Sequence, residues 1–353
     1  MAGSALEEDV TSSARAVEPA SPSVPSAAPD DLRLALRAAT LYYLDGLTQA
    51  EVAQRLGVSR PTAGRLVARA KANGLVRIEV VVPPDQQDDL HADEEQELEH
   101  LFGLTEAVVV GGNIDSKGAL DNSACWAPMG RAAARLLVRR IGVGETLGFT
   151  WGPEVVAVAT GLPSGAATCQ AIVQLDGAMS TVSYQTGAEY VLGRCAEQLQ
   201  ASMIRLPAPL YADVDTVASL KRDSLISRAL EAGRTADMMI FGVGAVSTST
   251  TLFEGSFLDT DVLKAVTARG AVGEIGGRFF TEDGAVLDGE LPQRTVSVPL
   301  EDVRRCESTV LVTGGAAKYA AALGALRGGF VRYLVCDVAC ARWLLGRAER
   351  RER

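Results

Sequence analysis

The side chains between residues 59 and 69 have the types and spacing that nucleic-acid recognition requires. Arginine can form two parallel hydrogen bonds with a guanine, and serine or threonine contacts phosphates or base edges. A solvated basic helix face is the alternative explanation for the charges alone. We predict that this segment binds DNA together with the start of the preceding helix; the predicted DNA-binding residues are Thr48, Gln49, Ser59, Arg60, Thr62, Arg65 and Arg69.

A second group of residues could bind a small polar ligand. Glycines follow several apolar segments, where they allow a ligand to approach the backbone closely. Lys318 could supply a cation for a phosphate, and Glu274 could accept hydrogen bonds from hydroxyl groups. Asp176 and Arg278 are weaker candidates. The predicted ligand-binding residues are Thr150, Trp151, Gly152, Gly242, Gly244, Glu274, Gly315 and Lys318.

Each residue of the second group also has an explanation without a ligand. A glycine after a strand often belongs to a plain turn, and a lysine at a helix start is often solvated. Trp151 is more readily explained by packing than by stacking on a ligand. The glycines match neither G-x-G-x-x-G nor the Walker A spacing, so neither a dinucleotide nor a nucleoside triphosphate is indicated. We therefore expect no cofactor.

Histidine and cysteine exclude several kinds of catalytic or metal site. The only histidines, His91 and His100, lie in one acidic polar stretch, so no Ser-His-Asp or Cys-His mechanism is possible beyond residue 100. None of the six cysteines forms a C-x-x-C pair, although Cys336 and Cys340 are four positions apart. We predict buried free thiols, no metal site and no catalytic residues.

The first group of residues requires two short helices joined by a tight turn. Thr48 and Glu51 form a T-x-x-E capping box, and Gly57 is suited to a left-handed helix end. Ser59 then makes a good N-cap, and Pro61 is tolerated in the first helical turn. This pattern predicts a helix-turn-helix. Its predicted core is Ala53, Leu56, Val58, Leu66, Val67 and Ala70, preceded by a helix that buries Leu34, Ala38, Leu41 and Leu44, and followed by a strand over 75–82.

The second group requires a parallel sheet, whose strand ends gather polar residues at one edge. Short apolar segments rich in β-branched residues alternate with helical patterns, as expected for a sheet that helices cover on both faces. The predicted helices cover 127–140, 187–201, 221–232 and 316–327. The predicted strands cover 107–110, 146–150, 171–175, 238–244, 309–315 and 333–337, and the Gly273-Glu274 pair is placed at a neighbouring strand end.

Length and charge divide the chain into unequal parts. The 353 residues carry a net charge of −10, yet residues 32–78 carry +6 and the remainder −16. A small basic module attached to a large acidic domain fits a DNA partner despite the negative average. No apolar stretch could cross a membrane and no secretory signal is present, so a cytoplasmic location is expected. We predict a disordered tail over 1–31, a DNA-binding domain over 32–83, a linker helix over 84–100 and a ligand-binding domain over 101–348.

The segment LTQAEVAQRLGVSRPTAGRLVARAKANGLVRIEV (47–80) resembles the DNA-binding domain of SorC-type sugar-responsive bacterial regulators. The resemblance continues through the segments LGFTWGPEVVAVA (147–159), AVGEIGGRFFTEDG (271–284) and VTGGAAKYAAALGALRGGFVRYLVCD (312–337). It covers nearly the whole chain from about residue 32, and the segments are specific only in combination. Two departures stand out: Gly64 replaces a serine common in relatives, and the alanines of GGAAK replace hydroxyl residues.

The resemblance implies an α/β protein with an N-terminal winged-helix-like domain and a Rossmann-like effector domain of the sugar-phosphate isomerase and CoA-transferase type. Members bind phosphorylated sugars or related molecules and assemble as oligomers, usually tetramers, on double-stranded palindromic operators. We therefore expect a homo-oligomeric transcriptional regulator, a dimer or tetramer, controlled by a sugar phosphate or related carbohydrate. The two departures leave an unphosphorylated effector possible.

Two other functions account for only part of the sequence. An isomerase-like or deaminase-like enzyme would share the fold, but the ligand-binding domain lacks histidine and the DNA-binding module would need another explanation. A structural DNA-binding protein without ligand would not account for the glycine-rich strand ends. The sequence leaves open the identity of the effector, the operator and the sign of the regulation.

Overall fold

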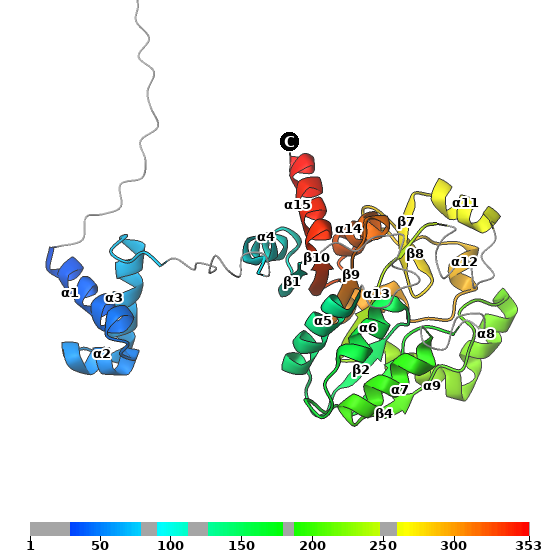
Figure 1. The fold of residues 1–353 in the computed structure, drawn as a ribbon, viewed down its shortest axis with the longest axis horizontal. Helices are drawn as coiled ribbons and strands as arrows, with labels where there is room; N and C mark the ends of the chain where they lie inside the picture. The colour runs from blue at the N-terminus through cyan, green and yellow to red at the C-terminus, as the bar shows by residue number, and fades with distance from the viewer. Residues whose placement is uncertain (1–28, 79–89, 112–125, 179–186, 248–259, 353) are drawn as a thin grey trace, which may run out of the picture. The chain divides into compact units, whose positions relative to one another are not determined.

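The computed structural model describes residues 29–78, 90–111, 126–178, 187–247 and 260–352 (Figure 1). The chain divides into two compact units, residues 1–81 and 82–353, and each is considered by itself. The predicted disordered tail lies outside the described residues up to residue 28, whereas Pro29–Asp31 form the start of the first helix.

The small unit is a helix-turn-helix, as the sequence predicts. Thr48 accepts a hydrogen bond from the amide of Glu51, whose carboxylate accepts one from the amide of Thr48. Gly57 ends the helix with φ of 68°, and Ser59 caps the next helix. The predicted core residues pack together with the first helix. The helical segments are α1 (Pro29–Ala39), a π-helical turn (Thr40–Leu44), α2 (Gln49–Leu56) and α3 (Arg60–Ala72).

Two sequence predictions for this unit are wrong. Leu44 is 81% exposed, although Ala38 and Leu41 are buried as expected. The amide of Asp45 donates to the carbonyl of Thr40, and this wider π turn rotates Leu44 away from the buried face. The strand predicted over 75–82 is absent from residues 75–78, because no strand among the described residues of this unit pairs with them. Residues 79–82 lie outside the described part.

The large unit contains a seven-stranded sheet in which every neighbouring pair is parallel. All six strand predictions correspond to strands of this sheet. The sequence missed one edge strand, whose three residues are too few for a recognisable pattern. In spatial order the strands are β1 (Glu106–Val110), β10 (Tyr333–Asp337), β9 (Thr309–Thr313), β5 (Met238–Phe241), β2 (Thr146–Phe149), β3 (Ala171–Gln174) and β4 (Ser202–Ile204).

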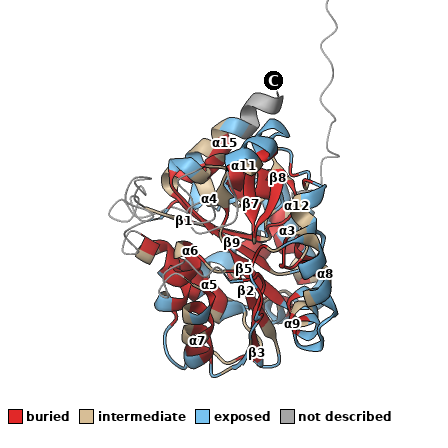
Figure 2. Ribbon diagram, turned by 90° about the vertical axis from the view of Figure 1, so that its right-hand side faces the viewer, coloured by how far each residue is buried: buried red, intermediate tan, exposed pale blue. Residues whose placement is uncertain are grey.

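Helices cover both faces of this sheet, so the five strands between its two edge strands are largely buried (Figure 2). The helices on the two faces are α5 (Ala127–Arg140), α6 (Pro153–Gly161) and α7 (Ala188–Leu199) in one cluster, and α4 (Ala92–Phe102), α13 (Leu300–Arg305), α14 (Tyr319–Arg327) and α15 (Val338–Glu352) in the other. Adjacent residues of one strand belong to different clusters: Val310 and Val312 belong to the first, and Leu311 belongs to the second.

Several further helices complete the domain. Asp223 accepts hydrogen bonds from the amides of Leu225 and Ile226 and so divides the helix predicted over 221–232 into two. The helix predicted over 316–327 begins with a 3₁₀ turn over Ala316–Lys318. The remaining helices are α8 (Val214–Arg222), α9 (Ser224–Arg234), α11 (Thr260–Ala268) and α12 (Glu290–Gln293).

The predicted linker helix belongs to the large domain. Residues 84–89 of the prediction lie outside the described part, and α4 begins only at Ala92. Leu98 has no exposed area, while Glu95 and Glu99 accept hydrogen bonds from the amides of Val109 and Ala107, each at 2.9 Å. These carboxylates occupy amides on the free edge of β1, so α4 covers the edge of the sheet.

A second sheet corrects the placement of Glu274. Three antiparallel strands, β6 (Gly244–Ala245), β7 (Ala271–Ile275) and β8 (Arg278–Thr281), form a hairpin with one additional strand. Glu274 therefore lies inside a strand, paired with Gly244 and Phe279, and not at the end of a parallel strand. The sequence could not distinguish the two because the segment is short, apolar and flanked by glycines.

Candidate functional site

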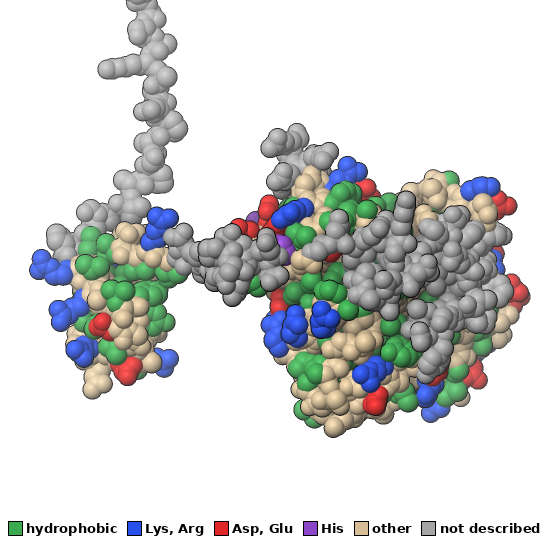
Figure 3. Space-filling view, viewed as in Figure 1, with side chains coloured by type: hydrophobic (Ala, Val, Ile, Leu, Met, Phe, Trp, Pro, Cys, Tyr) green, Lys and Arg blue, Asp and Glu red, His purple; other side chains and the backbone are tan. Residues whose placement is uncertain are grey.

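The exposed start of α3 carries the predicted DNA-binding side chains. Ser59, Arg60 and Arg65 are exposed, and Thr62 is half-buried. The hydroxyls of Ser59 and Thr62 are 2.8 Å apart, and the guanidinium of Arg65 donates to Thr62 at 3.4 Å. These contacts hold the polar groups together on one surface, with both arginine head groups available to a partner. Lys and Arg side chains dominate the charged surface of this unit in Figure 3.

The remaining predicted DNA-binding residues have contacts within the protein. Thr48 is occupied in the capping box of α2. A Cβ atom at Gly64 would lie 3.3 Å from the side-chain oxygen of Gln49, so glycine at 64 allows Gln49 to lie against α3. Arg69 pairs with Asp31 at 3.2 Å, which places it against α1 and away from the start of α3.

A pocket in the large domain lies where the sheet changes winding direction. From β2 the chain continues outward to β3 and β4, and from β5 it continues the other way to β9 and β10. Ligands of open α/β sheets bind at such a switch point, beyond the carboxyl ends of the strands. The loops after β2 and β5 line the pocket together with β7 and the 3₁₀ turn, and its cavity volume is about 80 Å³.

Seven of the eight predicted ligand-binding residues line this pocket, and they are Thr150, Trp151, Gly152, Gly242, Gly244, Glu274 and Lys318. The eighth, Gly315, does not line it. Its amide donates to a carboxylate oxygen of Asp337 at 2.8 Å, so it is not free to bind a phosphate. Trp151 is held in place, because its indole N–H donates to the carbonyl of Gly177 at 3.0 Å and its ring packs against the cluster around Leu210.

Lys318 does not present a free ammonium group. It forms an ion pair with Glu154, whose side chain is only 3% exposed, and its Nζ lies 5.3 Å from the centre of the Trp126 ring. Burial lowers the pKa of the Lys318 ammonium to about 7. Glu154 lies in the first turn of α6 and was not singled out from the sequence. The only available signal was an acidic residue within the apolar segment that follows Gly152.

Two more carboxyl groups line the pocket. Glu274 accepts a hydrogen bond from the amide of Gly277 at 2.7 Å, and burial raises its pKa to about 7. Asp176 is 3% exposed, and its Oδ1 has no hydrogen-bond partner within the described part of the chain. Burial and the nearby Glu274 carboxyl raise the pKa of Asp176 well above its usual range. The pocket is therefore rich in acidic groups.

Close packing explains the glycines beside these acids. A Cβ atom at Gly244 would lie within 2 Å of the Glu274 carboxyl, at 1.9 Å from its Oε1. Gly276 and Gly277 have φ of 54° and 76° and form the turn whose amide binds Glu274. The glycines here serve the positioning of a buried carboxyl group as much as the access of a ligand.

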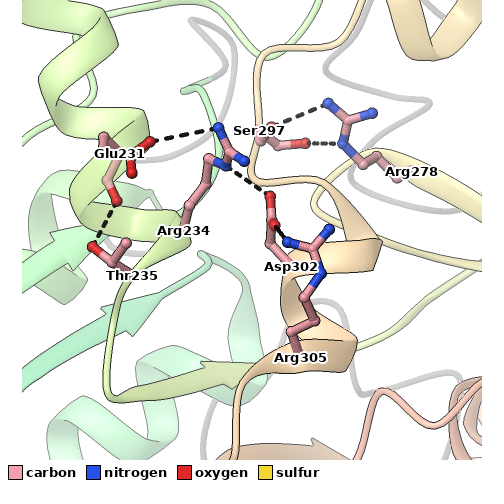
Figure 4. Close-up of polar contacts among 7 residues, drawn as sticks. All are labelled: Glu231, Arg234, Thr235, Arg278, Ser297, Asp302 and Arg305. Carbon is pink, nitrogen blue, oxygen red and sulfur yellow. Dashed lines mark hydrogen bonds and ion pairs between the residues drawn. The ribbon is translucent and has the colours of Figure 1, made fainter.

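Arg278 is buried but does not line the pocket. Its guanidinium donates to the hydroxyl and the carbonyl of Ser297, at 2.9 and 3.1 Å (Figure 4). The backbone of Ser297 pairs with that of Asp176 in an isolated antiparallel bridge. By binding Ser297, Arg278 therefore helps to hold the segment that contains Asp176. Nearby, Asp302 accepts hydrogen bonds from Arg234 and Arg305, each at 2.8 Å. Arg278 is therefore a positioning residue and does not line the pocket.

The titration of Glu274 should make the stability of the domain depend on pH. The folded chain keeps this proton up to about pH 7, whereas the unfolded chain loses it near the model-peptide value of 4.5. Between these values the unfolded state binds fewer protons, so the free energy of unfolding should fall as the pH rises. Thermal unfolding of the wild type and Glu274→Gln at pH 5.0 and 7.5 measures this effect. We expect the stability of Glu274→Gln relative to the wild type to be higher at pH 7.5 than at pH 5.0. If the difference between the two proteins were the same at both pH values, the raised pKa of Glu274 would be contradicted.

The structure provides no sign of other kinds of site in its described residues. No cluster of three potential metal ligands occurs among them. Four of the five described cysteines are buried and all five are free thiols, as predicted, and Cys125 lies outside the described part. No helix in the described ranges is long and apolar enough to span a membrane.

A helix-turn-helix unit and an α/β domain with a pocket at its switch point define a class of protein, the DNA-binding regulators with a ligand-sensing domain. Comparison with known proteins agrees with this class. The Sugar-bind family of sugar-binding domains matches residues 88–346, and the MarR family matches residues 38–86.

Relatives resemble the chain over nearly its whole length. The deoxyribonucleoside regulator of Bacillus subtilis is 31% identical and aligns over 89% of this chain and 97% of its own. The sorbitol operon regulator of Klebsiella pneumoniae is 28% identical over 90% of this chain and 98% of its own. The crystal structure of full-length SorC from Klebsiella pneumoniae has a TM-score of 0.67 at 25% identity, covering 90% of this chain and 99% of that one.

The chain belongs to the SorC family of sugar-binding transcriptional regulators. It is a DNA-binding regulator of transcription with a domain for a small-molecule effector, as its sequence predicts. The enzyme alternative receives no support from the relatives, which are named as regulators.

Proposed function

We propose that the chain binds operator DNA through the start of α3 and that a carbohydrate effector in the switch-point pocket controls this binding. The observation that carries the proposal is the pocket itself, where the ends of β2 and β5 meet β7 and gather polar groups. We further propose that the protein acts in the cytoplasm as a homo-oligomer, a dimer or tetramer, because helix-turn-helix units read paired half-sites. The effector is bound and released without chemical change.

Control of this kind requires the effector to bind the DNA-bound and free states with different affinities. The test is a titration of carbohydrates into the full-length protein on its operator, with the operator first obtained by selection from random double-stranded DNA. At least one carbohydrate that raises the melting temperature should also change operator affinity. A stabilising carbohydrate without any effect on operator binding would contradict effector control.

Operator binding should weaken steeply with salt. Residues 32–78 carry a net charge of +6, and each phosphate that a cation neutralises releases counterions from the DNA. Fluorescence anisotropy between 50 and 200 mM salt should show a loss of affinity of about tenfold or more. A flat response would exclude the basic face of the helix-turn-helix as the binding surface.

A further inference from the structure

The effector pocket offers hydrogen-bond acceptors that no part of the described structure occupies. Asp176 and Glu274 are 3% and 8% exposed and both line the pocket. Glu274 uses one carboxylate oxygen to bind the amide of Gly277. Oδ1 of Asp176 has no hydrogen-bond partner among the described residues. A buried polar atom without a partner costs free energy that a hydrogen-bond donor on a ligand would recover.

The side chains of the same pocket offer little to an anion. Among its described lining residues Lys318 is the single cation, and it is held by Glu154. The amide of Gly315, which follows the strand in the position expected to bind a phosphate, is occupied by Asp337. Three carboxyl groups, those of Glu154, Asp176 and Glu274, surround the space. A phosphate would add negative charge to a site that three acidic residues already line.

We propose that the effector of this pocket is an unphosphorylated polyhydroxyl compound, a sugar or alditol whose hydroxyl groups donate to Asp176 and Glu274. The inference rests on the proposed function and specifies its ligand. A neutral polyol supplies donors without adding charge, so it satisfies Oδ1 of Asp176 and leaves the ion pair between Lys318 and Glu154 intact. A phosphorylated sugar would have to separate that pair and approach two buried acids.

The protonation of the two acids agrees with a neutral ligand. Burial raises the pKa of both groups, and the Glu274 carboxyl raises that of Asp176 further. A dianion beside them would oppose their ionisation further. A neutral hydroxyl group can donate to a carboxylate or accept from a carboxylic acid, so it binds in either protonation state.

The test is a comparison of parent compounds with their phosphate esters on the full-length protein. Calorimetric titrations use erythritol, ribitol, sorbitol and ribose, then sorbitol 6-phosphate, ribose 5-phosphate and inorganic phosphate. At least one parent compound should bind about tenfold or more tightly than its ester, and should alter operator affinity. An ester that binds more tightly than its parent and alters operator affinity would overturn this inference and leave the proposed function standing. If no compound of either kind binds or alters operator affinity, both fail.

Three variants assign the binding to the named groups. Asp176→Asn should weaken binding of the parent compound about tenfold, whereas Asp215→Asn, on the exposed start of α8, should leave it unchanged. Glu154→Gln should free Lys318 and increase the affinity for the phosphate esters. Wild-type affinity of the parent compound in Asp176→Asn would overturn the inference. If Asp176→Asn does not fold, Glu154→Gln decides the question. An unchanged affinity of Glu154→Gln for the phosphate esters would then overturn the inference.

Discussion

Replacing Lys318 by methionine should destabilise the large domain by about 3–5 kcal/mol, the cost of leaving a buried charge without its partner. Glu154 is only 3% exposed and Lys318 only 18%, so loss of the ammonium group leaves a buried carboxylate without its ion-pair partner. The expected result is a lower midpoint of urea unfolding with an unchanged slope. At urea concentrations below the new midpoint, the variant should still bind the operator without effector, because the substitution lies outside the helix-turn-helix.

A double variant distinguishes loss of the ion pair from loss of packing. Lys318→Met combined with Glu154→Met should be much more stable than Lys318→Met alone, since apolar replacement of a buried pair is often nearly neutral. As a control, Arg194→Met breaks an exposed pair with Glu197 and should cost less than about 1 kcal/mol. If the double variant were as unstable as the single one, the large effect would come from packing and not from the stranded carboxylate.

Removing the guanidinium of Arg65 or Arg60 should cost about 1–3 kcal/mol of specific DNA binding and relax the preference for the operator. Both side chains are exposed at the start of α3, which enters the major groove in helix-turn-helix proteins. The measurement is the affinity of Arg60→Ala and Arg65→Ala for the selected operator and for a scrambled duplex. The loss of affinity should be larger for the operator than for the scrambled duplex.

Arg33→Ala provides the matched control. Arg33 lies exposed on α1, away from the start of α3 in the sequence, and should contribute mainly to phosphate binding. Its loss should weaken binding to the operator and the scrambled duplex alike. If all three variants lowered both affinities equally, α3 would not be the element that reads the bases.

Local rules explain why so much of the helix-turn-helix was predictable. The capping box at Thr48, the left-handed Gly57 and the Ser59 cap each depend on residues within four positions of one another. One exception is Leu44, where a single π-helical turn changes the buried face. Periodicity assumes a constant number of residues per turn, so a single irregular turn defeats it.

The pocket was predictable in its position but not in its electrostatics. Glycines and polar residues after apolar segments identified seven of its lining residues, because parallel strands present their carboxyl ends at one edge. The sequence could not indicate that Glu154, which is 164 positions away from Lys318, would neutralise it. It also could not indicate that Asp337 would occupy the amide of Gly315. Contacts of this kind depend on the order of strands, which no local pattern encodes.

The sequence by itself determined the helix-turn-helix, six strands of the parallel sheet and the family to which the chain belongs. These features follow from capping, hydrophobic periodicity and charge, which act over short stretches of chain. Only the tertiary structure decided that Glu274 lies within an antiparallel strand and that α4 covers the edge of β1. Only the fold decided that three carboxyl groups surround one paired lysine, because long-range packing sets which charges are buried together.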